Sequence, residues 1–581
     1  MKRVVLFLIP VLISAFADSP AWVEKSNRNA QVLLKLQARF FPESAGKSGV
    51  SGVDEQIVDM KPDAPERQMQ AMKAAELELV ARLGLEKDPL VRQDLEILIG
   101  AVRDSIRGIE LNRKYYVPYA NVAQIVYGGL NGLLDDQIAA NRRPTALARL
   151  RRYTGMEQGY TAIAILAEQR TRERLGQAGL LGPPTAEVKK DLANSGFFVD
   201  GIGQLFEKYK IAGYQEAYAK LKEQIAAYDN FVRKEVLPRS RADFRLPPEM
   251  YDFSLRQYGV DIPAAELTAM AHAAFLQIQG EMQTLASQVA RQKNWSATDY
   301  RDVIRELKKD QLLGEQILPH YHMRIGQIEE IIRRERLVTL PNRPARMILA
   351  SAAETAAQPA PHMRPPRLIG NTGESGEFVL PLNIPAAGGA TLRYDDFTFA
   401  AASWTLTSHE VRPGHEMQFA AMVEKGVSQA RAIFAFNSTN VEGWGLYAEF
   451  IMLPFMPLDG QLISLQHRLM RAARAFLDPE LHMGKVTPEQ ALRVLEDDVV
   501  LSEAMANQEV ERYTFRSPAQ ATSYFYGYTR LAALRAETEK ALGAKFDQQK
   551  FHDFILSQGL LPPSLLRKAV FKDFIGRPVA L

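Results

Sequence analysis

The sequence predicts a mainly α-helical protein with a large multi-helix, lobed architecture and one small β element. Apolar residues recur at helical spacing over four long stretches, near 54–115, 122–176, 199–235 and 263–292. Segments rich in proline, glycine or alanine separate these stretches, at 182–184, 246–248 and 344–375. A chain of 581 residues is long enough for two or three lobes, each with its own core.

The one β element is expected at residues 376–383, where aromatic and branched side chains give a strand composition. Pro381 suggests an edge strand, because proline cannot donate a hydrogen bond to a neighbouring strand. An edge strand beside an active site could bind an extended peptide through main-chain hydrogen bonds. A short strand that only closes the lobe is an equally good interpretation.

The N-terminus has the pattern of a cleaved export signal over residues 1–17. Lys2 and Arg3 precede an apolar run at 4–13, and Ala15-Phe16-Ala17 is typical of a cleavage site. The run is too short for a transmembrane anchor. We therefore expect an exported protein, periplasmic or secreted, with no stable membrane anchor after signal cleavage.

Composition narrows the possible chemistry and partners. The sequence contains no cysteine, so disulfides, thiolate metal sites and a lipid-attached cysteine are excluded. Its formal charge of +3 becomes +1 when Lys2 and Arg3 leave with the signal. This balance argues against a nucleic-acid partner. Oligomeric state is left open.

The most informative motif runs from His409 to Met417. A zinc-binding helix usually carries histidines at i and i+4 with a glutamate after the first, but here His409 and His415 are six positions apart. Six steps on an unbroken helix place them about 120° apart. Pro413 and Gly414 between them can break the helix and redirect the chain. The helix should therefore end or deform by Pro413.

A third element supplies the missing ligand. Glu442 follows His415 by 27 residues, and Glu449 lies two helical turns further on. Two imidazoles and one carboxylate leave zinc an open position for water, as hydrolysis requires. We predict one Zn²⁺ bound by His409, His415 and Glu442, although another divalent transition metal could take its place. The alternative is a surface helix with two acidic residues, but Gly443 and Trp444 indicate close packing.

These motifs resemble those of a large bacterial family of uncharacterised domains, assigned to the thermolysin-like and oligopeptidase-like metallopeptidase superfamily. The residues that match its HExxPGHxxQ and EGWxxYxE motifs are His409, Glu410, Pro413, Gly414, His415, Gln418, Glu442, Gly443, Trp444, Tyr447 and Glu449. The resemblance extends from about 100 to 575. It implies a metallopeptidase-like catalytic region at 346–581 behind an N-terminal helical region at 18–345.

Downstream similarities add further candidates. Residues 471–482 are similar to the family's arginine-rich helix ending in DxGxH, although Glu480 replaces the usual glycine. Similar segments follow at 511–513 and 517–524. Tyr524 and His482 are our candidates for the donor that stabilises the oxyanion. Core packing for Tyr524 and a structural helix-face network for His482 are the alternatives.

Glu410 is the predicted general base, which takes a proton from water and passes it to the leaving amine. Glu416 competes for this role, but it follows the second histidine rather than the first. Glu449 and Gln418 are candidates for orienting the imidazoles. Arg535 could meet a substrate carboxylate, although a solvated helix face is the simpler interpretation.

Together these features predict an exported zinc-dependent hydrolase, a metallopeptidase that cleaves short peptides or a small amide substrate. A hydrolase acting on a non-peptide amide or ester is the alternative within this class. A catalytically silent peptide-binding protein of the same fold is the alternative outside it, although the intact Glu410 argues against this. Natural substrate and exo- or endopeptidase action are left open.

Overall fold

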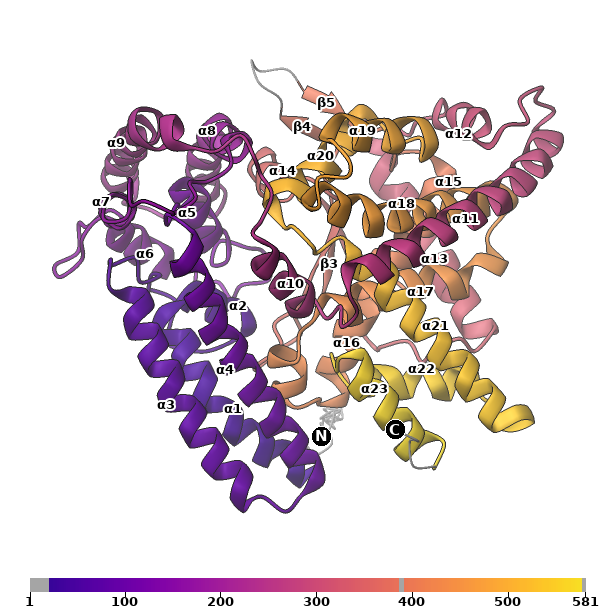
Figure 1. Ribbon diagram of the computed structural model, residues 1–581, viewed down its shortest axis with the longest axis horizontal. Helices are drawn as coiled ribbons and strands as arrows, with labels where there is room; N and C mark the ends of the chain where they lie inside the picture. Colours follow the sequence, from indigo (N-terminus) through magenta and orange to yellow (C-terminus); the bar gives the residue numbers. More distant parts are fainter. Residues whose placement is uncertain (1–19, 386–390, 577–581) are drawn as a thin grey trace, which may run out of the picture.

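The computed structural model describes residues 20–385 and 391–576, so the predicted signal at 1–17 lies outside the described residues. The chain is mainly helical, as predicted. Figure 1 shows the first part of the chain as a group of helices beside the rest of the molecule. These helices are α1 (Ala21–Phe40), α2 (Pro42–Ser48), α3 (Ala64–Leu85), α4 (Pro89–Tyr115), α5 (Val122–Asn131), α6 (Thr145–Tyr153), α7 (Ile163–Arg172), α8 (Thr185–Lys208) and α9 (Gln215–Phe231).

Helix α4 illustrates how local sequence sets these elements. It begins after Asp88, whose side chain accepts hydrogen bonds from the backbone N–H groups of Leu90 and Val91, and Pro89 occupies the first turn. Val91, Leu95 and Leu98 then face a core shared with α1 and α3. The predicted helical stretch near 54–115 is thus the α3–α4 hairpin, visible as the long pair of helices in Figure 1.

The remaining helices form the larger body of the molecule. Long α11 packs along α18, and α17 packs along α21. Residues 251–325 share one hydrophobic core with residues from 347 to 526, so this core joins segments on both sides of residue 345. The helices are α10 (Pro248–Gln257), α11 (Ala264–Lys293), α12 (Tyr300–Lys308), α13 (Ile317–Arg334), α14 (Ala352–Ala357), α15 (Ala400–Glu410), α16 (His415–Lys425), α17 (Ser438–Met452), α18 (Leu458–His482), α19 (Pro488–Arg493), α20 (Glu503–Glu511), α21 (Thr522–Leu542), α22 (Gln548–Ser557) and α23 (Pro563–Ala569).

The predicted strand exists, but its expected place at a sheet edge is wrong. Strand β3 (Glu377–Leu380) is fully buried at the centre of a three-stranded sheet, parallel to β1 (Arg346–Leu349) and antiparallel to β2 (His362–Arg364). Pro381 lies just beyond β3, so its missing N–H does not limit pairing. Both neighbouring strands come from the stretch at 344–375, which was expected only to separate other segments. Strands β4 (Asn383–Pro385) and β5 (Thr391–Arg393) form a separate antiparallel pair.

Among the residues that the structure describes, no helix has both the length and the apolar composition needed to cross a bilayer.

Candidate metal centre

The chain breaks between the two histidines, as the spacing predicted. Helix α15 ends at Glu410, Val411 leaves the helical region at φ −113° and ψ −90°, and α16 begins at His415. Only glycine fits at Gly414, because an added Cβ would lie 1.8 Å from the carbonyl oxygen of His409. His415 therefore starts a new helix and does not continue the turn that carries His409.

Trp444 holds this break in place. Its buried indole N–H donates to the carbonyl oxygens of Pro413 and Gly414, at 2.9 and 3.2 Å. The Gly414 carbonyl also accepts from the backbone N–H of Gln418, whereas the Pro413 carbonyl lies in the break between the helices, where Trp444 supplies its donor. The tryptophan beside Glu442 thus attaches the second motif to the break in the first.

The break brings the three predicted ligands together. One ligand atom each from His409, His415 and Glu442 can be chosen so that all lie within 4.8 Å of one another. Glu442 Oε2 is 3.2 Å from His415 Nε2 and 3.5 Å from His409 Nε2. Although burial favours the neutral acid, the two imidazoles hold the pKa of Glu442 well below its usual range. Its carboxylate is thus available as an anionic ligand.

Glycines let these groups approach one another. A Cβ on Gly445 would lie 2.7 Å from His409 Cε1 and 2.8 Å from His415 Cε1. A Cβ on Gly443 would lie 2.6 Å from the carbonyl carbon of Gly527, where α17 crosses α21. The close packing expected around Glu442 is confirmed. A cradle of two imidazoles and one carboxylate, kept open by glycine, fits a zinc-sized cation.

Glu449 orients the first imidazole. Its Oε1 accepts a hydrogen bond from His409 Nδ1 at 2.7 Å, which directs Nε2 towards Glu442. Thr405 donates to the other oxygen of Glu449 at 2.6 Å. Burial alone would raise the pKa of this carboxyl, but Arg471 and His409 lower the pKa of Glu449 to about 2. The second predicted orienting residue, Gln418, instead donates to Asn440.

Glu410 and Glu416 have different surroundings. Glu410 is buried near His415 and Glu442, and its Oε2 has no hydrogen-bond partner among the described residues. Burial is the main reason that the pKa of Glu410 rises to about 8, and a metal cation held by the triad would lower this pKa again. Glu416 is ion-paired with the buried Arg412. Of the two candidates for the general base, only Glu410 therefore lies at the triad with a carboxylate that makes no ion pair with a described residue.

Tyr524 lies against the triad from α21. Its ring stacks on that of His409, with centroids 6.2 Å apart and planes inclined by 16°. Its hydroxyl oxygen accepts a hydrogen bond from Arg512 Nη2 at 3.3 Å. Tyr524 thus borders the predicted metal ligands, and Arg512 lies beside it.

Similarity to known proteins identifies the family and the fold of this chain. A family described as "Bacterial protein of unknown function (DUF885)" matches residues 42–570. The chain belongs to this family. The match begins well before residue 100, where the resemblance was expected to start. No curated protein matches the sequence.

Two solved structures share the fold of this chain. "The putative lipoprotein from Colwellia psychrerythraea" aligns with a TM-score of 0.75 at 18% identity, covering 95% of this chain and 100% of the other. "A putative lipoprotein of unknown function from Shewanella oneidensis" aligns with a TM-score of 0.69 at 19% identity, with the same coverage. At this identity the likeness concerns the fold alone.

Two residues of the predicted arginine-rich helix, Arg471 and Arg474, form a cluster with Arg512 that was not predicted from sequence. The guanidinium carbons of Arg474, Arg512 and Arg471 lie 4.5, 5.5 and 5.8 Å from the centre of the Tyr524 ring. Arg471 and Arg474 are buried on α18, three residues apart. Paired charged residues on a helix face expected to be buried are the sequence signal that could have identified Arg471 and Arg474.

His482 does not join the triad, and its predicted catalytic role is replaced by a structural one. Its Nδ1 accepts the backbone N–H of Leu246 at 3.1 Å, and its Nε2 lies 2.9 Å from the carbonyl oxygen of Tyr513. Both ring nitrogens are therefore engaged by backbone groups. Arg535 is likewise engaged, by Tyr447 and Glu539.

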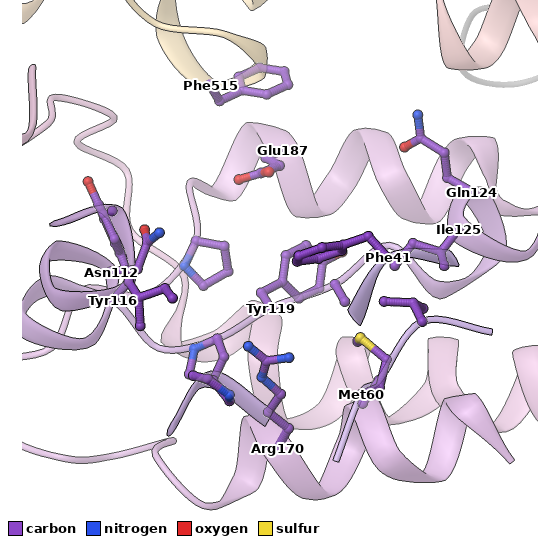
Figure 2. Close-up of a pocket in the computed structure, with 18 of the residues that line it drawn as sticks. Phe41, Met60, Asn112, Tyr116, Tyr119, Gln124, Ile125, Arg170, Glu187 and Phe515 are labelled. Carbon is purple, nitrogen blue, oxygen red and sulfur yellow. The ribbon is translucent and has the colours of Figure 1, made fainter. Parts of the chain in front are cut away.

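A large cavity lies between the N-terminal helices and the rest of the molecule. Its volume is about 1620 Å³, and Figure 2 shows Tyr119, Phe41 and Arg170 on one side with Phe515 opposite. The metal triad is not part of its lining. Thr514, Phe515 and Pro518 line the cavity and follow Arg512 in the chain, so the cavity reaches the segment that borders Tyr524.

Proposed function

We propose that this protein is a zinc-dependent hydrolase, a metallopeptidase that cleaves short peptides. The observation that carries the proposal is the convergence of His409, His415 and Glu442, with donor atoms within 4.8 Å of one another. Glu449 supports it, because a carboxylate behind a ligating imidazole is a common feature of zinc sites.

His409 Nε2, His415 Nε2 and a carboxylate oxygen of Glu442 would hold the ion. When bound, zinc supplies Lewis acidity and activates water at neutral pH. Glu410 accepts the proton from water at its free carboxylate oxygen and returns it to the nitrogen of the leaving amine. Tyr524 donates its hydroxyl hydrogen to the oxygen that becomes negative as the carbonyl is attacked.

Export is part of the same proposal. The charged and apolar leader at 1–17 supports it, as do the two proteins of similar fold that are described as putative lipoproteins. This chain has no cysteine to carry a lipid, so we propose a periplasmic or secreted protein released by signal cleavage.

Metal analysis and two substitutions test the hydrolase proposal. Protein purified without chelator should contain close to one equivalent of zinc or another transition metal, and His415→Ala should lose it. Glu410→Gln should retain the metal and lose hydrolysis of a mixed peptide library. Metal below about a tenth of an equivalent, or full hydrolysis by Glu410→Gln, would contradict the proposal.

A further inference from the structure

The ion pairs around Tyr524 leave one arginine without a carboxylate of its own. Arg474 makes two hydrogen bonds to Glu509, at 2.6 and 2.7 Å, and Arg471 pairs with Glu449 at 3.5 Å. Three guanidiniums therefore share two ion-paired carboxylates. Arg512 only shares Glu509, at 3.5 Å from an oxygen that already accepts from Arg474.

Arg512 is also the most accessible of the three. Its side chain is 18% exposed, whereas those of Arg471 and Arg474 are 6% and 4% exposed. A guanidinium that is reachable and shares its ion-paired carboxylate with another arginine is suited to a planar anion from outside. Bound zinc would add to the positive charge of this region, which favours an anionic substrate group.

The position of Arg512 limits what that anion can be. Its Nη2 lies 3.3 Å from the hydroxyl of Tyr524, whose ring stacks on the metal ligand His409. An anion held by Arg512 therefore lies beside the place where a peptide bond would be cut. Further along the same segment, Thr514 and Phe515 line the large cavity, of which Figure 2 shows Phe515.

We propose that Arg512 binds the free C-terminal carboxylate of the substrate. The inference rests on the proposed peptidase function and deepens it. It makes the enzyme a carboxypeptidase or dipeptidase, which removes the last residue of short peptides. The carboxylate lies one residue beyond the bond that is cut, and Arg512 positions that bond.

The experiment uses two pools of N-acetylated tripeptides, randomised at each position and differing only in a C-terminal acid or amide. We expect the full-length protein to hydrolyse the acid pool about 10- to 100-fold faster, from the loss of one charge-assisted hydrogen bond in the amides. Arg512→Gln should lower hydrolysis of the acid pool more than that of the amide pool, so that the two pools are cleaved at similar rates. Arg512→Lys should restore part of the preference.

A binding readout is independent of turnover. Immobilised Glu410→Gln protein should retain the acid pool more strongly than the amide pool, and Glu410→Gln/Arg512→Gln should lose this difference. Arg530→Gln removes an exposed guanidinium on α21 and serves as the matched control, with the acid preference intact.

Outcomes separate this inference from the proposed function. Equal hydrolysis of both pools by protein that contains metal and requires Glu410 overturns the carboxylate site alone. An equal loss on both pools in Arg512→Gln, with metal retained, also overturns it, because it would place Arg512 at the developing oxyanion. Absence of metal from the purified wild-type protein overturns the proposed function first.

Discussion

Glu449 shows how a single residue can set which nitrogen of a histidine faces a candidate metal site. By accepting from Nδ1 of His409, it leaves Nε2 as the nitrogen that faces Glu442 and His415. It is almost fully buried and also accepts from Thr405, so the imidazole has little freedom to turn. The geometry of the candidate site thus depends on a carboxylate outside the predicted ligands.

Replacing Glu449 by Gln should weaken metal binding. The amide can still accept from His409 but carries no charge, and losses of this kind reduce metal affinity by about 10- to 100-fold. Competition with a fluorescent chelator measures the change. Glu489→Gln, at an exposed position on α19, is the control and should bind metal as the wild type does. Unchanged affinity in Glu449→Gln would show that His409 is oriented by other contacts.

His482 contributes a pH dependence to stability. Burial lowers the pKa of this partly buried imidazole from its ordinary 6.5 to about 4, and its Nδ1 cannot take a proton while it accepts from Leu246. A depressed histidine pKa gives stability that is present above pH 6.5 and is lost as the pH falls towards 4.

The variant His482→Gln should remove this pH dependence, because a neutral amide can accept and donate hydrogen bonds in similar positions. Between pH 7 and pH 4.5 the wild-type free energy of unfolding should fall more than that of the variant, by up to about 3 kcal/mol. Urea denaturation at several pH values measures the difference. Parallel curves for the two proteins would refute the argument.

At the scale of elements, α17 and α21 determine where Glu442 and Tyr524 lie. The two helices meet at Gly443 and Gly527, and a Cβ on Gly527 would lie 2.0 Å from the carbonyl oxygen of Thr439. Gly527→Ala should therefore force the helices apart and reduce the free energy of unfolding by about 1–3 kcal/mol. Metal affinity should fall as well, because Glu442 is carried on α17.

A matched control for Gly527→Ala is available on α11. An added Cβ on Gly280 would meet nothing within 4 Å, so Gly280→Ala should stabilise the protein by up to about 1 kcal/mol through helix propensity. Thermal unfolding and chelator competition measure both variants. Similar stability changes in the two variants would show that contact at the helix crossing is not the cause.

Sequence could predict the parts of the site that depend on local spacing. The break after Glu410 and the close packing at Gly443 follow from proline and glycine positions, and the structure has both. The arginine cluster could not be assigned in this way, because Glu509 is 35 residues from Arg474 and only the fold brings them together. The neighbours of β3 were missed for the same reason, since strand pairing is a long-range property.

At the scale of the whole molecule, one buried network attaches the N-terminal helices to the segment between the two metal motifs. Asp94 on α4 is fully buried and accepts from Arg431 Nε at 2.8 Å and from Ser428 Oγ at 2.6 Å. Ser26 on α1 donates to the same carboxylate. This network fixes one end of the helical group that forms a wall of the large cavity.

Breaking this network should loosen the molecule as a whole. Asp94→Asn leaves the Arg431 guanidinium buried without its charge partner, so the free energy of unfolding should fall by about 3 kcal/mol or more. The double variant Asp94→Asn/Arg431→Met removes both charges and should recover part of this loss, with a coupling of about 0.5–3 kcal/mol. Urea denaturation measures the cycle, and hydrogen exchange in α1 and α4 reports local loosening. If the losses in the single variants Asp94→Asn and Arg431→Met simply add in the double variant, the ion pair does not hold the N-terminal helices to the rest of the molecule.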